Sequence, residues 1–193
     1  MFELVKGTQA ASLYIAPEAD DYAGLSHVAE KLQQDIKLVT GVTPEITKTL
    51  SNGYQIIPGT IGKNPVIDEM IANGKLNVSQ LDGKRESYAL CLVDGDKLVI
   101  AGTETVAALH GMYHISEKIG VSPWVYWGDA IPRKQAEIVW DESIEFTSKE
   151  PSVKFRGFFM NDEWPSLGNF VMNTFGDFNV KFYDRVFDLL LRL

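Results

Sequence analysis

The stretch KFRGFFMNDEWPSLGN, residues 154–169, decides how the second half of the chain is organised. The apolar run 153–160 has the character of a strand, and it ends at Asn161, Asp162 and Glu163. Carboxylates at the end of a buried strand cost free energy unless they are paired or used in chemistry. The pattern therefore predicts a candidate site at the end of a strand. The alternative is a solvated loop in which a carboxylate caps the next helix.

Composition and charge exclude several classes of protein. The chain has 193 residues, of which 45% are hydrophobic, so it suits one large domain or one domain plus part of another. Its formal net charge of −8, without a basic patch, predicts no nucleic-acid partner and no anionic membrane partner. The single cysteine, Cys91, rules out an intramolecular disulfide framework, and its apolar neighbours predict a buried thiol rather than a reactive one.

The N-terminal residues lack the long apolar core, preceded by basic residues, that marks a secretory signal peptide. No apolar run reaches the length needed to span a membrane. We therefore expect a soluble chain that is cytoplasmic as given, or secreted or periplasmic if a leader has been removed.

The first 120 residues alternate between strand and helix patterns, which is typical of a layered α/β domain. Residues 22–39 carry apolar side chains at three-and-four spacing, and Gly41 follows where a helix end favours a left-handed residue. The Asp94-Gly95 pair between two apolar runs predicts a β-hairpin. Pro58-Gly59 predicts a turn, and Thr103 is a candidate helix cap. The predicted strands are 11–16, 44–48, 54–57, 87–93, 97–101 and 136–140, and the predicted helices are 22–39, 64–72 and 104–118.

A charged and polar segment, 141–151, has the composition of a linker. After it come the strand-like run, a long loop, and a helix from Asn179 whose apolar side chains share one face. Leaving that face in water would forgo about 1.5–3 kcal/mol for each large apolar side chain. We therefore expect the preceding domain, a second copy of the chain in a homo-oligomer, or a continuation of the chain to cover it, and we favour the last. The face consists of Phe182, Val186, Leu189, Leu190 and Leu193.

Several stretches together resemble a known family. AGTETVAALHGMYHISEKIGVSPWVYW (101–127) resembles the end of the small α/β domain that precedes the barrel in the β-hexosaminidase and α-glucuronidase groups of glycoside hydrolases. KFRGFFMNDEWPSLGNF (154–170), followed by FNVKFYDRVFDLLLRL (178–193), resembles the first barrel strand, loop and helix of glycoside hydrolase family 115, the xylan α-1,2-glucuronidases. VAEKLQQDIKLVTGVTPEI (28–46) is similar to the beginning of that family. The resemblance covers nearly the whole chain, but only the front portion of the family's chain.

This resemblance implies an architecture and an activity. It implies an accessory α/β domain with a β-sheet and flanking helices over 1–145, a linker over 146–152, and the first strand and helix of a truncated (β/α)8 barrel over 153–193. Chemistry in such barrels lies at the C-terminal ends of the strands. The implied activity is removal of glucuronic acid or 4-O-methylglucuronic acid from glucuronoxylan by an inverting mechanism, with no cofactor or metal. The 193-residue chain by itself would be inactive.

The resemblance also implies roles for individual residues. Asp162 and Glu163 are the catalytic candidates, and Asn161, Arg156 and Trp164 are the substrate-binding candidates. Inversion needs two carboxyl groups about 6.5–9.5 Å apart, which sequence neighbours cannot be assumed to supply. We therefore expect Asn161 and Asp162 to contact the sugar or water, while Glu163 orients the loop. Trp164 departs from the small residue that the family carries at this position.

Three residues keep two interpretations each. Arg156 can clamp a sugar carboxylate through its bidentate guanidinium, or form an ion pair with an acid of the loop. His110 and His114 are four residues apart on a predicted helix, as zinc ligands often are. The glutamate of the metalloprotease motif is missing between them and no third ligand is evident, so we interpret them as core or interface residues.

The aromatic residues Trp124, Tyr126 and Trp127 form either a sugar-stacking platform or, as we favour, packing between two domains. For the chain as a whole, two other functions stay open. One is a non-catalytic module that binds carbohydrate or a protein, and the other is a related hexosaminidase-like glycosidase.

Overall fold

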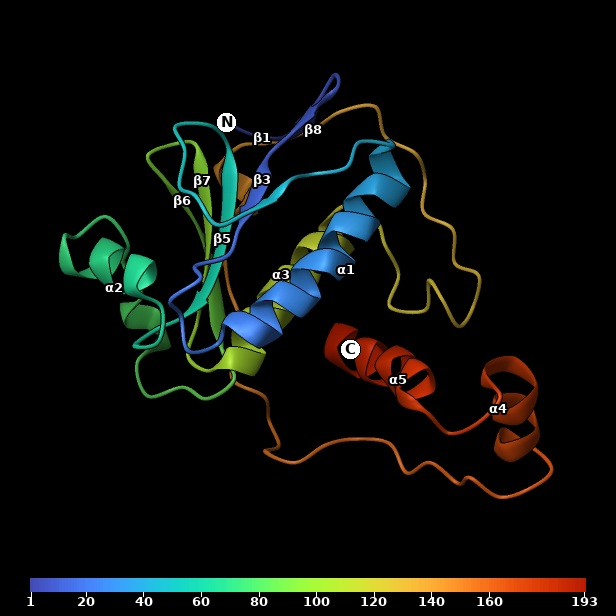
Figure 1. Ribbon diagram of the computed structural model, residues 1–193. Coiled ribbons are helices and arrows are strands. Elements are labelled where there is room, and N and C mark those ends of the chain that lie inside the picture. The colour runs from blue at the N-terminus through green and yellow to red at the C-terminus, as the bar shows by residue number, and fades with distance from the viewer.

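The computed structural model describes residues 1–193, which form an α/β unit followed by two further helices (Figure 1). Short 3-10 turns occur at Ser79–Leu81 and Glu142–Ile144. The strands are β1 (Phe2–Lys6), β2 (Gln9–Ala10), β3 (Ser12–Tyr14), β4 (Ile46–Thr47), β5 (Gln55–Thr60), β6 (Tyr88–Val93), β7 (Lys97–Gly102), β8 (Ile138–Trp140) and β9 (Phe146–Thr147). The helices are α1 (Tyr22–Thr40), α2 (Pro65–Ala72), α3 (Thr105–Lys118), α4 (Leu167–Phe175) and α5 (Val180–Arg192).

A six-stranded sheet with the order β4-β3-β5-β7-β6-β9 forms the middle layer of the unit, and a separate three-stranded sheet has the order β2-β1-β8. The strands β4, β3, β5 and β7 are parallel, whereas β6 is antiparallel to β7 and to β9. Sheets with helices on both faces are the usual solution for alternating strand and helix patterns. The predicted α/β fold class, with a sheet and flanking helices, is therefore confirmed.

The six-stranded sheet separates two cores, because successive side chains of a strand point to opposite faces. On β7, Leu98 and Ile100 pack into the larger core beneath α1 and α3, while Val99 and Ala101 pack into the smaller core beneath α2. Figure 1 shows α1 and α3 on one side of the sheet and α2 on the other.

Where periodicity and turn chemistry agree, the predicted elements are confirmed. Helix α1 buries Leu25, Val28 and Leu32 on one face, and it ends at Gly41, whose φ of 82° is left-handed and whose N–H donates to the Lys37 carbonyl. The β6–β7 hairpin turns at Asp94-Gly95, whose φ values of 55° and 80° are both positive. The loop between the paired residues Val93 and Lys97 has three residues, and the left-handed conformation that closes it is one that glycine adopts readily.

Two local predictions are wrong because tertiary pairing overrides the local signal. Pro58 and Gly59 lie inside β5, where they pair with Ile100 and Ala101 of β7, so they form no turn. The residue before α3 is Glu104, and the cap predicted at Thr103 is absent. The Thr103 hydroxyl instead accepts a hydrogen bond from the Ser87 N–H at 3.1 Å, joining the start of β6 to the end of β7.

Short strands formed with distant partners were not predicted. Strand β1 pairs antiparallel with β8, about 135 residues later in the chain, and β8 itself falls within the predicted strand 136–140. Strand β9 lies within the segment 141–151 that was expected to be a linker, and it adds to the sheet through Thr147 opposite Ala89 and Phe146 opposite Leu90. Pairs of this kind depend on tertiary proximity, which local sequence patterns do not encode.

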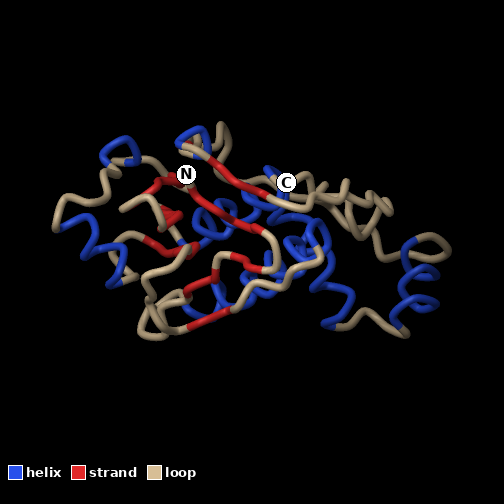
Figure 2. The backbone as a smooth tube through the Cα atoms, turned by 90° about the horizontal axis from the view of Figure 1, so that it is seen from above, coloured by secondary structure: helices blue, strands red, loops and turns tan.

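The run 153–160, which we predict to be a buried barrel strand, forms no strand within these 193 residues. The segment is extended, pairs with no strand, and leaves Phe155 and Phe159 87% and 94% exposed. A strand is stable only when neighbouring strands satisfy its backbone and cover its side chains, and no strand of this chain lies beside it. The loop after it contains the helix α4, which was not predicted, at the edge of the molecule in both views (Figures 1 and 2).

Helix α5 begins at the predicted residue, because the Asn179 side chain accepts hydrogen bonds from the N–H groups of the next turn. Its apolar face is covered within the chain, since Phe182, Val186 and Leu189 are buried and the helix packs against α3. The face proposed for self-association is therefore mostly occupied, although Leu193 stays 59% exposed. None of the helices combines the length and apolar character needed to cross a membrane.

Candidate functional site

The loop with the carboxylate candidates lies on the surface between the extended run and α4. Asn161, Asp162, Glu163 and Trp164 are all exposed, and the indole of Trp164 is 70% exposed. The Glu163 N–H donates to the Asn161 side-chain oxygen at 3.2 Å, which folds the loop into a local turn. Neither carboxylate forms an ion pair. Both are therefore free to contact a ligand.

The loop is held at both ends by a small apolar cluster. Met160 precedes the loop and Leu167 follows it, and both pack against this cluster. Gly168 brings the start of α4 close to the loop, since a Cβ at this position would lie 3.1 Å from the Asp162 carbonyl oxygen. The cluster has a buried centre of Val171, Phe182 and Val186, with Trp127, Met160, Leu167, Phe175, Phe178 and Leu190 around it. We call it the α4–α5 cluster.

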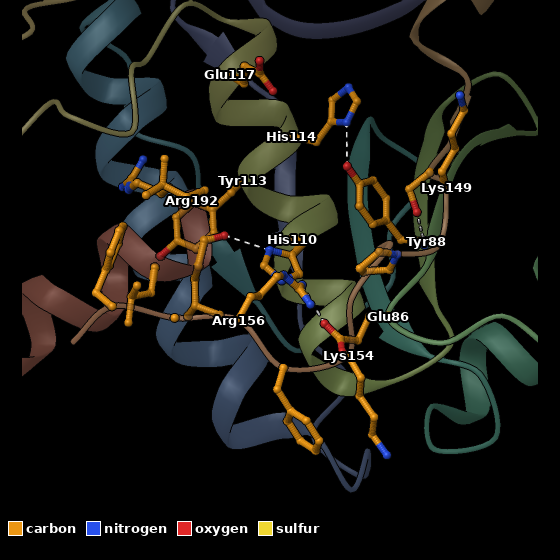
Figure 3. Close-up of a pocket in the computed structure, with 18 residues that line it drawn as sticks. Glu86, Tyr88, His110, Tyr113, His114, Glu117, Lys149, Lys154, Arg156 and Arg192 are labelled. Atoms are coloured by element: carbon orange, nitrogen blue, oxygen red, sulfur yellow. Dashed lines mark hydrogen bonds and ion pairs between the residues drawn. The ribbon is translucent and has the colours of Figure 1, made fainter.

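Arg156 lies apart from the loop, in an open cavity of about 810 Å³ between α3, β6 and the segment 148–158 (Figure 3). Its guanidinium forms an ion pair with Glu86, with 2.7 Å between Nη2 and Oε2. Of the two interpretations of Arg156, the ion pair is the one that the structure contains, but with an acid before β6 rather than an acid of the loop. The cavity does not include Asn161, Asp162 or Glu163.

The two histidines of α3 face this cavity as neutral, hydrogen-bonded side chains (Figure 3). His110 Nδ1–H donates to the Leu191 carbonyl at 2.9 Å, and burial lowers the pKa of His110. His114 Nδ1 lies 2.8 Å from the Tyr88 hydroxyl, and burial lowers the pKa of His114 while raising the pKa of Tyr88 to about 12. No group of three or more metal-ligating side chains occurs in the chain. These contacts match the interpretation of both histidines as core and interface residues.

A buried charged network, which sequence reasoning missed, fastens the end of α5 to the α/β unit. Arg192 Nη1 lies 2.7 Å from Asp35 Oδ2 on α1, and its Nε lies 2.8 Å from Asp188 Oδ2. The Tyr113 hydroxyl donates to Asp188 at 2.6 Å. Burial raises the pKa of Asp35, which shows that desolvation outweighs the attraction of Arg192. One signal was available in the sequence: Asp35 interrupts the apolar face of the helix 22–39.

Of the three aromatic residues after α3, Trp127 packs between the two parts of the chain as we favoured. The Trp127 ring joins the α4–α5 cluster, with its centroid 6.2 Å from that of Phe170, and its Nε1–H donates to the Arg185 carbonyl at 3.3 Å. The Arg185 guanidinium lies 4.3 Å from the centroid of the Tyr126 ring. Trp124 is 48% exposed and is not part of the cluster.

Two comparisons with known proteins point to the same family of glycoside hydrolases. The family model of glycosyl hydrolase family 115 matches residues 148–193. The whole chain superposes on 25% of a solved structure described as a family GH115 4-O-methyl-alpha-glucuronidase, BtGH115A, with specificity for decorated arabinogalactans, with a TM-score of 0.83 and 28% identity. A structure of CpGH84D is similar over 56% of this chain and 17% of its own, with a TM-score of 0.43 and 14% identity. No curated protein matches the chain.

The chain thus spans a quarter of the length of the first of these structures. The segment that the family model matches, 148–193, includes the loop of Asn161, Asp162 and Glu163 together with α4 and α5. The structural match extends the relationship over all the remaining residues, including the α/β unit. The resemblance drawn from the sequence is confirmed in part: residues 148–193 match the model of glycosyl hydrolase family 115, and the whole chain is similar to part of a solved structure from that family.

Proposed function

We propose that the chain is the N-terminal part of an enzyme that removes glucuronic acid or 4-O-methylglucuronic acid side chains from a polysaccharide. The observation that carries this proposal is the match of the entire chain to a quarter of a 4-O-methyl-alpha-glucuronidase. Glucuronoxylan is the substrate that we favour, because the sequence resembles the xylan α-1,2-glucuronidases. Decorated arabinogalactan is a second candidate, because it is the substrate named for the similar solved structure.

In this proposal residues 1–145 are an accessory α/β domain, 146–152 a linker, and 153–193 the first strand and helix of a (β/α)8 barrel. The exposure of Phe155 and Phe159 supports the assignment of the barrel strand. Aromatic side chains that are almost fully exposed in this chain are the side chains that neighbouring strands would cover in a completed barrel.

The loop after that strand would supply part of the active site, because barrel enzymes carry their chemistry at the C-terminal ends of the strands. Asn161 and Asp162 would contact the sugar or the attacking water, and Glu163, whose N–H is bonded to Asn161, would orient the loop. The exposed indole of Trp164 offers a flat apolar face to a sugar ring. An inverting mechanism also needs a second carboxyl group about 6.5–9.5 Å away, which later barrel strands would provide.

The test is release of glucuronic acid. The purified 193-residue chain and a longer protein in which it continues into a complete barrel are incubated with glucuronoxylan, with glucuronic-acid-decorated arabinogalactan, and with aryl hexosaminides. We expect release from one or both glucuronic-acid-bearing glycans by the longer protein and none by the 193-residue chain. Release by the 193-residue chain would show that the site is complete without further strands. Cleavage of aryl hexosaminides alone would identify a hexosaminidase-like enzyme, and binding to the glycans without release would identify a non-catalytic module.

A further inference from the structure

The loop of Asn161, Asp162 and Glu163 makes no hydrogen bond of its own to the α/β unit. The bonds within and around it are the turn from Glu163 N–H to Asn161 and a 3.5 Å bond from Gly168 N–H to the Glu163 carbonyl. The position of the carboxylates relative to the rest of the chain therefore depends on what holds the residues on either side of the loop.

Those flanking residues share the α4–α5 cluster. Met160 enters it directly before Asn161, and Leu167 enters it at the start of α4. Because an interior is close-packed, a displacement of one side chain in such a cluster is transmitted to the others.

Trp127 is the one residue from the first 147 that joins the α4–α5 cluster. It contacts both helices: its ring lies 6.2 Å from that of Phe170 on α4, and its Nε1–H donates to the Arg185 carbonyl on α5 at 3.3 Å. The same indole therefore connects the α/β unit with the helix that follows the loop and with the helix after that.

Helix α5 has further attachments to the α/β unit, through Asp184 to Lys31 at 2.7 Å and through Arg192 to Asp35 at 2.7 Å. Helix α4 is more weakly held, since it packs on α5 and meets the α/β unit through Trp127. The loop precedes α4 directly. Of these three attachments to the α/β unit, the one through Trp127 is therefore separated from the carboxylates by the fewest contacts.

We infer that Trp127 is a positioning residue for Asn161, Asp162 and Glu163, which sets the place of these side chains by holding the α4–α5 cluster against the α/β unit. The catalytic consequence rests on the proposed function above, whereas the structural consequence can be tested without it. Misplacement of a reacting group by about 1 Å can lower a rate on the order of 100-fold.

The structural test uses the 193-residue chain labelled with ¹⁵N. We expect Trp127→Ala to shift the amide resonances of residues 160–163, while the amides of β5 and β7 keep their wild-type resonances. Trp127→Phe retains an aromatic ring in the cluster and is expected to restore most of the wild-type positions. Trp124→Ala is the matched control, because this tryptophan lies in the same segment but outside the cluster.

If Trp127→Ala perturbs the whole chain, Phe170→Ala is used in its place. This variant removes the ring on α4 that faces Trp127, and Phe170 is itself exposed, so the fold should tolerate the change. Unchanged amides at 160–163 in the folded variant, or equal shifts from Trp124→Ala, would overturn the inference.

The functional test uses a longer protein that contains the chain and releases glucuronic acid. There we expect Trp127→Ala to lower kcat about 10–100-fold with KM changed less than about threefold, and Trp127→Phe to recover most of kcat. A lower melting temperature with unchanged kcat would mean that Trp127 has only a structural role. Amide shifts at 160–163 in the 193-residue chain, combined with no release of glucuronic acid by the wild-type longer protein, would leave the positioning contact intact and reject the proposed function.

Discussion

Arg192 Nη1 lies 2.7 Å from Asp35 Oδ2, although 157 residues separate them in the chain. The two side chains are 5% and 6% exposed, so the ion pair is buried, and Asp188 completes it from one turn earlier on α5. Buried ion pairs cost desolvation free energy that their mutual attraction only partly offsets, so their value lies more in defining geometry than in stability. In this protein the pair connects the end of α5 to α1.

Arg192→Met should lower the free energy of unfolding by about 3–5 kcal/mol, because it leaves Asp35 and Asp188 buried without a cation. Urea denaturation followed by circular dichroism measures the change. The control is Lys6→Met, which breaks the exposed ion pair with Glu3 and should leave the stability nearly unchanged. Equal losses in the two variants would contradict the assigned role of the buried pair.

The histidines of α3 should make the chain less stable at pH 5 than at pH 7.5. Burial lowers the folded-state pKa of His110 and of His114, so the unfolded chain takes up protons that the folded chain does not. Their contribution to the free energy of unfolding is complete above the unfolded pKa of about 6.5 and falls as the pH drops below it. The variant His110→Gln/His114→Gln should show a smaller decrease between pH 7.5 and pH 5. An identical pH dependence in both proteins would refute this prediction.

Gly111→Ala should destabilise the chain by about 1–3 kcal/mol, because a Cβ there would lie 2.3 Å from Ile100 Cγ2 and 3.1 Å from the Tyr88 ring. Gly24→Ala on α1 is the matched control. Its Cβ would lie 3.6 Å from the nearest atom, on Thr105, so it should stabilise the helix by about 0.5–1 kcal/mol. Thermal unfolding of both variants decides whether α3 packs on β7 as closely as described.

Asp162→Asn should lower kcat for release of glucuronic acid on the order of 100-fold or more in a longer protein that carries out this reaction, if the carboxylate acts in proton transfer. Asp177→Asn, an exposed carboxylate in the turn between α4 and α5, should leave kcat within about twofold. Initial rates on glucuronoxylan provide the measurement. Wild-type rates in the Asp162 variant would remove this residue from the site.

Phe159→Ser tests whether the run 153–160 is a barrel strand. In the 193-residue chain the side chain is 94% exposed, so the substitution should change stability by less than about 0.5 kcal/mol. In a longer protein with a completed barrel the same substitution should cost about 3 kcal/mol or more. Phe182→Ala, in the buried centre of the α4–α5 cluster, should be costly in both proteins. A negligible effect of Phe159→Ser in both would argue against the strand.

The sequence predicts local elements well where one periodic pattern has one stable solution. The apolar repeat over 22–39 and the Asp94-Gly95 turn need no distant partner to be recognised, and both are confirmed. Pro58-Gly59 carries an equally strong local signal for a turn, yet β7 pairs with both residues and holds them in a parallel strand. The ladder hydrogen bonds of a central strand outweigh such a local preference.

The sequence singled out candidate site residues, but it did not predict how they are arranged. The loop residues Asn161, Asp162 and Glu163 stand out in the sequence because carboxylates follow an apolar run. The separation of Arg156 from that loop, and its pairing with Glu86, depend on contacts between segments 70 residues apart. The run 153–160 is exposed because a strand is buried only when neighbouring strands cover it, and its own sequence cannot provide those strands.

By itself, the sequence determined the α/β character of the first 120 residues and the resemblance to glycosyl hydrolase family 115, because both are contained in local patterns and motifs. Only the tertiary structure decided that Arg192 meets Asp35 and that Trp127 joins α4 to α5. Contacts of this kind follow from how whole helices pack across a sheet. No local window of the sequence contains both partners, so their choice becomes visible only when the chain is folded.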